Sequence, residues 1–145
     1  SRICNMPVIS ETVRVKVRFS EVDPIRMVWH GNYIKYLEDA REAFGHRYGI
    51  SYLQISGHGY YAPIYDLQVR FLRAATVDDT LLVTITWKPA EGAKLCFDYE
   101  IRNEKDNGLI LRASTIQLFT TADGEFDPVG PAFFQEWKDK MLSEY

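Results

Sequence analysis

The chain has 145 residues, a formal net charge of −3, and 46% hydrophobic against 26% charged residues. That balance is ordinary for a globular protein, and the length predicts one domain spanning residues 1–145. A chain without a basic excess is not expected to bind nucleic acid. No apolar run approaches the roughly 18 residues of a membrane span, so no membrane partner is expected either. Cys4 and Cys96 lie far apart in the sequence, which favours free thiols in a reducing, cytoplasmic compartment.

The first predicted element is a strand over residues 13–19, where four apolar residues alternate with three cationic ones. We expect its cationic face to meet solvent or another subunit, with contact to phosphate as the alternative. A long amphipathic helix is predicted next, because apolar residues recur every three or four positions. They form one stripe on a helix of 3.6 residues per turn: Tyr33, Leu37, Ala40, Phe44 and Tyr48.

The ends of this helix are also predicted by its flanking residues. We expect it to begin near Gly31 or Asn32, since an asparagine side chain can accept from free backbone N–H groups as the N-cap. Gly49 is expected to follow the last turn. The charged residues off the apolar stripe are expected to form a solvated face: Lys35, Glu38, Asp39, Arg41 and Glu42.

Beyond the helix, the pattern indicates mainly strands and tight turns. Residues 50–59 predict a loop or short helical turn, and residues 60–71 a strand bent near Pro63. Further strands are predicted over residues 81–87, 95–101 and 110–120, and the Asn-Gly pair at 107–108 is a strong hairpin signal. Pro131 is expected to open a short C-terminal helix. One helix followed by hairpin-linked strands predicts an α+β domain, in which the helix covers an antiparallel sheet.

The segment that joins the first strand to the long helix carries a recognisable series: Phe19, Asp23, Pro24, Val28, Trp29, His30, Asn32 and Tyr33. In this order it resembles the hotdog-fold acyl-CoA thioesterases of the 4-hydroxybenzoyl-CoA thioesterase type. The resemblance continues more weakly through residues 69–83 and the later strands. It implies a sheet wrapped around one central helix, an acyl-CoA substrate, and a homodimer or homotetramer with active sites at the subunit interface.

Asp23 is the first candidate catalytic residue. Pro24 biases the backbone of Asp23 away from helix, so the carboxylate is expected to project from a turn. A carboxylate there can attack a thioester carbonyl or deprotonate the water that does so. The alternative is that Asp23 simply caps the turn.

The beginning of the helix is the second candidate element. Its first backbone N–H groups have no partner within the helix, and the helix dipole adds partial positive charge there. The resemblance implies that the N–H of His30 polarises the thioester oxygen. The His30 side chain is a further catalytic candidate, with structural support of the turn as the alternative. His46 and His58 have no ligand spacing with His30, so we expect no metal and no cofactor.

Arg26 departs from the family pattern, which usually has glycine at this position. Glycine adopts positive φ without penalty, so arginine implies either a strained or a rearranged turn. Arg26 is expected to pair with Asp23 or to bind an anionic acyl group or a phosphate. The phosphates of coenzyme A also predict a cationic rim that includes Arg73, Lys88 and Lys94. Tyr33 is a candidate for the acyl pocket, with a place in the core as the alternative.

Three functions fit these residues. The first is an acyl-CoA thioesterase that uses Asp23 and the helix N-terminus. The second is a hotdog protein that binds acyl-CoA or an acyl carrier without hydrolysing it, which Arg26 would favour. The third is a hotdog dehydratase or hydratase, in which His30 and Asp23 would act together on an acyl thioester. The acidic residues of the helix offer another catalytic base in a second branch of hotdog thioesterases, but here a solvated face is the better interpretation.

Overall fold

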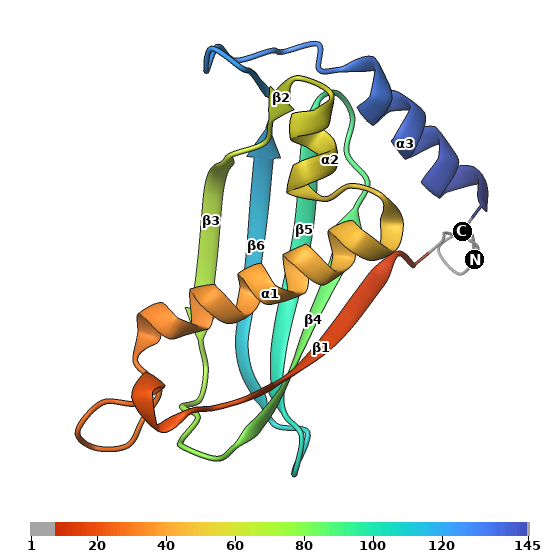
Figure 1. Cartoon of the computed structure of the whole chain (residues 1–145). Helices are drawn as coiled ribbons and strands as arrows, with labels where there is room; N and C mark the ends of the chain where they lie inside the picture. The colour runs from red at the N-terminus through yellow and green to blue at the C-terminus, as the bar shows by residue number, and fades with distance from the viewer. Residues whose placement is uncertain (1–7, 145) are drawn as a thin grey trace.

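The structure is a computed structural model that describes residues 8–144, and its main feature is an antiparallel sheet wrapped around one long helix (Figure 1). The helix is α1 (His30–Tyr48). The sheet has five strands, in the order β1 (Ser10–Lys16), β4 (Thr80–Lys88), β5 (Lys94–Asn103), β6 (Leu109–Leu118) and β3 (Ile64–Phe71). Two further strands pair with each other, β2 (Tyr60–Tyr61) and β7 (Thr120–Thr121). The other helices are α2 (Tyr52–Gly57) and α3 (Ala132–Glu144).

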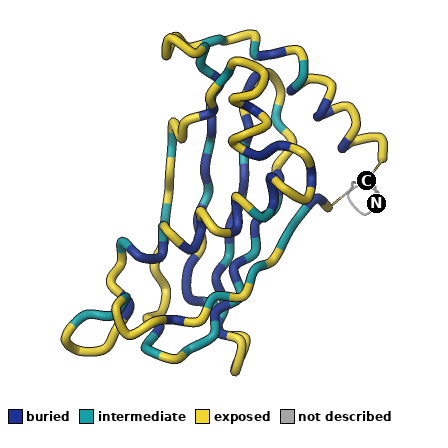
Figure 2. Tube along the Cα trace, in the orientation of Figure 1, coloured by how far each residue is buried: buried dark blue, intermediate teal, exposed yellow. Residues whose placement is uncertain are grey.

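This arrangement is the hotdog fold, which confirms the predicted α+β class. Buried residues concentrate in the central strands β4, β5 and β6 and recur along α1, whereas β3 and most connecting loops are largely exposed (Figure 2). Along β4 and β5 every second residue is buried, as expected for strands with one face on the core. Pro63 separates β2 from β3, as predicted, and the predicted hairpin residue Asn107 has a positive φ of 57°.

The apolar stripe of α1 is confirmed, since all five of its predicted residues are at most 8% exposed. Gly49 ends the helix in the left-handed conformation, also as predicted. The predicted N-cap is wrong: the helix begins at His30 with Trp29 as N-cap, and no side chain caps it. Asn32 lies in the first turn, where its side-chain Nδ2 donates to the backbone oxygen of Glu21 at 2.8 Å.

Arg41 is a second correction, because it belongs to the core and not to a solvated face. It is 1% exposed. Its Nε donates to Oε1 of Gln117 and its Nη2 to the backbone oxygen of Ile50, both at 2.9 Å. The guanidinium also lies over the ring of Tyr52, 4.7 Å from the centroid. Burial lowers the pKa of Arg41. A buried charge persists only with such partners.

Other expectations fail or fall outside the described part of the chain. Phe19 does not extend the first strand; it opens a 3₁₀ turn (Phe19–Glu21) and is 76% exposed. Cys4, one of the two predicted free thiols, lies outside the described residues. Cys96 is a free thiol on β5. Within residues 8–144, no helix combines the length and the apolar character needed to cross a bilayer.

The close approach of α1 to α2 can be tested at Gly45. A Cβ at this position would lie 2.7 Å from Cα of Ser51 and 2.9 Å from Nη1 of Arg41. Because the Ser51 contact is with backbone, it cannot relax cheaply. We expect Gly45→Ala to lower the free energy of unfolding by about 1–2 kcal/mol, since overpacking outweighs the helix propensity of alanine.

Chemical denaturation of Gly45→Ala and Gly57→Ala measures this difference. Gly57 is a matched control at the end of α2, because a Cβ there meets no atom within 4 Å. Equal stability of the two variants would contradict the packing of α1 against residue 51.

Candidate active site

A short hairpin connects the first strand to α1 and places Asp23 beside the beginning of the helix. Val22 and Val28 form an antiparallel bridge, and the backbone N–H of Asp23 donates to the oxygen of Met27 at 2.8 Å. The N–H of Trp29 donates to the oxygen of Glu21 at 3.1 Å. Two residues of extended backbone, about 7 Å, therefore separate Asp23 from Glu21, whose backbone oxygen accepts the N–H of the helix N-cap residue Trp29.

The Asp23 carboxylate is oriented by its own turn. Its Oδ1 accepts backbone N–H groups from Ile25 at 3.0 Å and from Met27 at 3.1 Å. The predicted capping role is therefore present. Among residues 8–144 no hydrogen bond or ion pair to Oδ2 is found, and the residue is half-buried. Asp23 can cap the turn with one oxygen and still offer the other to a ligand.

Arg26 holds the left-handed conformation that a glycine would adopt freely, with φ of 68°. The turn is therefore strained and not rearranged, and a non-glycine residue in this region costs about 1–2 kcal/mol. The predicted pairing with Asp23 is wrong, because no ion pair of Arg26 occurs within the described residues. Its side chain is exposed at the tip of the hairpin.

The N-terminus of α1 leaves backbone donors open. Within residues 8–144 no acceptor is found for the N–H groups of His30 and Gly31, the first two residues of the helix, whereas Asn32 already donates to the oxygen of Trp29. The indole of Trp29 lies against this turn, since a Cβ on Gly31 would overlap the ring. Two unpaired amides at the positive end of a helix favour an anionic or carbonyl oxygen.

The His30 ring does not contact Asp23. Its centroid lies 4.9 Å from that of the Trp29 ring, at an interplanar angle of 42°. The side chain is exposed, and no hydrogen bond or ion pair of the ring is found in the described part of the chain. The structure thus offers the backbone of His30 to the site more directly than its imidazole.

The predicted substrate-binding residues lie at two ends of the sheet. Tyr33 is 3% exposed and accepts the N–H of Ala75 at 3.0 Å, which places it in the core near the site. Arg73 lies at the same end but pairs with Asp106 at 2.7 Å. Lys88 and Lys94 flank the hairpin at the opposite end, about 26 Å along β4 from Thr80. One copy of the chain does not bring these lysines to Asp23.

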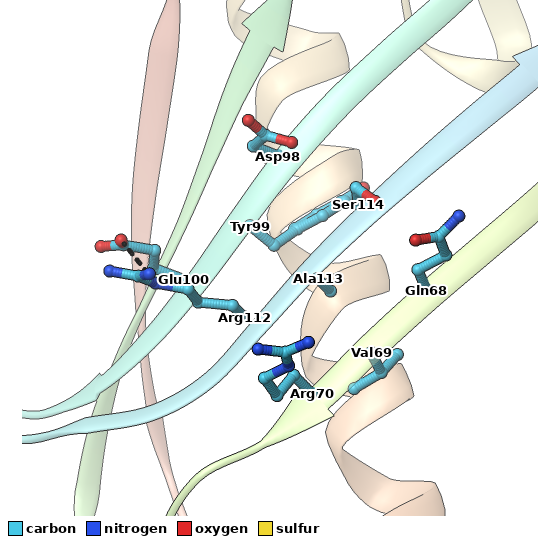
Figure 3. Close-up of a pocket in the computed structure, with 9 residues that line it drawn as sticks. All are labelled: Gln68, Val69, Arg70, Asp98, Tyr99, Glu100, Arg112, Ala113 and Ser114. Atoms are coloured by element: carbon cyan, nitrogen blue, oxygen red, sulfur yellow. Dashed lines mark ion pairs between the residues drawn. The ribbon is translucent and has the colours of Figure 1, made fainter.

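Asp23 lines neither of two hollows beside the sheet that bear on the site. One, of about 480 Å³, is on the face of the sheet opposite α1, where Arg70 and Arg112 lie on adjacent strands and Arg112 pairs with Glu100 (Figure 3). The other, of about 760 Å³, separates β1 from α1 and is bordered by Glu21 and Lys35. Of these two, the second adjoins the segment that precedes the helix N-terminus.

Comparison with known proteins identifies the family. The family model of the thioesterase superfamily matches residues 26–110, which is more than half of the chain. This chain belongs to the thioesterase superfamily. The match begins three residues after Asp23, so it does not extend to the candidate carboxylate.

Individual proteins that are named as thioesterases are also similar to the chain. The Bacillus subtilis (strain 168) protein named "Putative acyl-CoA thioesterase YneP" is 26% identical over 89 residues, which cover 61% of this chain and 64% of that protein. The 4-hydroxybenzoyl-CoA thioesterase of Pseudomonas sp. strain CBS-3 is 26% identical with a TM-score of 0.75, covering 88% of this chain and 98% of that one. The DHNA-CoA thioesterase of Staphylococcus aureus shares the fold, with 24% identity, a TM-score of 0.80, and coverage of 90% and 89%.

Two residues of this thioesterase-superfamily site, Glu21 and Thr76, are not indicated as site residues by the sequence. Glu21 holds the helix start, because its carboxylate accepts the Tyr36 hydroxyl at 3.1 Å while its backbone oxygen binds Trp29 and Asn32. Thr76 contacts the hairpin from fifty residues away. The Glu21 carboxylate also accepts the backbone N–H of Arg18 at 2.8 Å across the 3₁₀ turn, but an arginine three residues before a glutamate is not a capping signal, so no local pattern indicates Glu21. No local signal indicates Thr76.

The strain at Arg26 predicts a gain in stability on Arg26→Gly. Removing the left-handed penalty outweighs the added entropy of glycine in the unfolded chain, so we expect a gain of about 0.5–1 kcal/mol. Arg18→Gly is the matched control, because Arg18 has an ordinary φ of −92° and should lose stability. Thermal and chemical unfolding of both variants tests this, and a loss at both positions would refute strain at Arg26.

Proposed function

We propose that this chain is an acyl-CoA thioesterase, which hydrolyses an acyl-CoA to the free acid and coenzyme A. One observation carries the proposal. The hairpin that leads into α1 holds an oriented carboxylate, Asp23, and the first turn of the helix that follows has backbone N–H groups without acceptors among the described residues. Membership of the thioesterase superfamily and the similarity to proteins named as CoA thioesterases support the same reaction.

In the proposed reaction, the thioester oxygen accepts from the backbone N–H groups of His30 and Gly31. Negative charge develops on this oxygen as the carbonyl carbon becomes tetrahedral, and each well-placed donor stabilises it by roughly 3–4 kcal/mol. Oδ2 of Asp23 either attacks the carbon directly or takes a proton from the attacking water. Collapse of the intermediate breaks the C–S bond. When Asp23 acts as base, the proton that it took from water passes to the sulfur and coenzyme A leaves as the thiol. When Asp23 is the nucleophile, coenzyme A leaves as the thiolate, which takes a proton from solvent or from His30, and water then hydrolyses the mixed anhydride to the free acid and the Asp23 carboxylate.

The His30 imidazole has a secondary place in this proposal. In this proposal its exposed ring serves as a proton donor to the leaving sulfur. The hydratase or dehydratase alternative would instead require His30 and Asp23 to act together over the substrate. Within the described residues the two side chains share no hydrogen bond, which favours the thioesterase.

The binding-only alternative depended on a turn disturbed by Arg26. The turn keeps its left-handed geometry and the two hydrogen bonds to Asp23, so the position of the carboxylate does not require glycine at residue 26. We propose that the exposed Arg26 side chain meets an anionic group of the substrate.

We further propose that the working unit is a homodimer formed along β3, in which Lys88 and Lys94 bind the phosphates of coenzyme A held by the partner's site. β3 is an edge of the five-stranded sheet and exposes apolar side chains, including Leu67 and Phe71. Such an edge favours pairing with another strand. Antiparallel pairing of two β3 strands would bring the lysine end of one copy to the Asp23 end of the other.

The proposed chemistry predicts that Asp23→Asn abolishes turnover without unfolding the protein. Asparagine can still accept both backbone N–H groups through Oδ1, but it cannot act as nucleophile or base. We expect at least a hundredfold fall in kcat. The assay is release of coenzyme A from short, long and aromatic acyl-CoAs.

The matched control for this variant is Asp127→Asn. Asp127 likewise accepts two backbone N–H groups through Oδ1, both at 3.1 Å, in a turn of its own. It should keep wild-type activity. Absence of turnover by the wild type across the whole panel would refute the thioesterase.

The proposed dimer predicts that Leu67→Glu yields monomers with greatly reduced turnover, because a carboxylate would be buried at the paired edge. Leu142→Glu is the control on α3, where the leucine is similarly exposed at 48% against 39% for Leu67. Sedimentation velocity and the coenzyme A assay measure both effects. A Leu67→Glu protein that remains dimeric would exclude β3 as the interface.

A further inference from the structure

The strained backbone at Arg26 is held from outside its own hairpin. The hydroxyl of Thr76 donates to the backbone oxygen of Arg26 at 2.6 Å. Met27 and Thr76 form an isolated β-bridge, and the N–H of Val28 donates to the oxygen of Ala75 at 2.9 Å. Residues 75–76 therefore act as a short third strand beside the Asp23 hairpin.

This third strand is itself fixed to the core. The N–H of Ala75 donates to the buried hydroxyl of Tyr33 on α1. The N–H of Thr76 donates to Oδ2 of Asp79 at 3.0 Å, and the backbone oxygen of Asp79 accepts from Val17 at 2.9 Å. Since Ala75 is fully buried, the Thr76 hydroxyl has little freedom to follow a movement of the hairpin.

The contact with Arg26 is transmitted directly to Asp23. The N–H of Arg26 donates to the backbone oxygen of Asp23 at 2.8 Å. The positive φ of Arg26 then turns the next residue, Met27, so that its N–H reaches Oδ1 of Asp23. If Arg26 relaxed to negative φ, this second hydrogen bond would be lost and the carboxylate could rotate.

We propose that Thr76 is a positioning residue for Asp23: its hydroxyl keeps Arg26 in the left-handed conformation that orients the carboxylate. The inference rests on the proposed role of Asp23 in thioester hydrolysis. A glycine at position 26 adopts the same conformation without help. The contribution of Thr76 to turnover should therefore depend on which residue occupies position 26.

The test is a double-mutant cycle of Thr76→Val and Arg26→Gly, assayed by coenzyme A release. Valine keeps the shape of threonine and removes the hydroxyl. With Arg26 present, we expect Thr76→Val to lower kcat about tenfold and leave KM within about twofold, because a small misplacement of a catalytic group reduces rate more than binding. In the Arg26→Gly background, the same substitution should change kcat by less than about twofold.

Three further variants separate positioning from other effects. Thr76→Ser retains the hydroxyl and should restore most of kcat. Thr84→Val removes a threonine hydroxyl that contacts Thr12 at 2.8 Å on the outer face of the sheet, and it should leave turnover unchanged. Asp23→Asn reports on the proposed function itself. Thermal unfolding of each variant identifies any loss caused by misfolding.

Each outcome decides the proposal. An equal fall in kcat in the wild-type and Arg26→Gly backgrounds, or a change confined to KM, overturns the positioning role of Thr76. A Thr76→Val protein of full activity beside an inactive Asp23→Asn protein also overturns it, while the proposed function stands. Substantial turnover by Asp23→Asn overturns the proposed function and this inference together.

Discussion

The burial of one face of α1 against the concave side of the sheet is the constraint on which the rest of the structure depends. Ala40 and Phe44 are fully buried in this contact, and each large apolar side chain removed from water stabilises it by roughly 1.5–3 kcal/mol. The buried Arg41 adds direction to this apolar contact, because its hydrogen bonds to Gln117 and to residue 50 fix the rotation and the height of the helix over β6. An apolar stripe alone, without these directional hydrogen bonds, would let α1 slide or rotate more freely over the sheet. The position of the helix N-terminus follows from this packing.

The first two turns of α1 carry that position outward to the site. Asn32, Tyr33 and Tyr36 are buried, yet each ends in a polar atom that bonds to a loop: Asn32 and Tyr36 to Glu21, and Tyr33 to Ala75. Burial raises the pKa of Tyr36, and the nearby Glu21 carboxylate raises it further, so the hydroxyl remains a donor over the physiological range. Side chains of this kind join core packing to loop geometry. Hydrogen bonds from one rigid helix thus hold both loops that form the site.

The sequence predicts what is periodic or local in this molecule. The stripe from Tyr33 to Tyr48, the hairpins and the left-handed Gly49 follow from spacing and turn chemistry. The buried Arg41 could not be predicted, because its burial depends on Gln117, which is 76 residues away. The proposed positioning of Asp23 by Thr76 is equally non-local, because the hydroxyl of Thr76 reaches Arg26 from 50 residues away. The arginine at residue 26 indicated only a strained or a rearranged turn. The N-cap was misassigned because the asparagine bonds outward to a loop and not to its own helix.

The turn-capping and catalytic interpretations of Asp23 are not exclusive alternatives. Two amides fix one carboxylate oxygen, and because the group is planar they also fix the direction of the other. A nucleophile or base held in this way loses little further freedom when substrate binds, which is the advantage of preorganisation. Orienting the carboxylate costs conformational energy at Arg26 in the same turn. This residue is left-handed, and its backbone oxygen accepts a hydrogen bond from Thr76, outside the hairpin. Strain of this type persists only where surrounding structure enforces it, and it is concentrated at functional sites. A turn whose sole task was to reverse the chain would gain stability from glycine at residue 26, and the exposed arginine found there is what motivates the proposal that this hairpin meets an anionic group of the substrate.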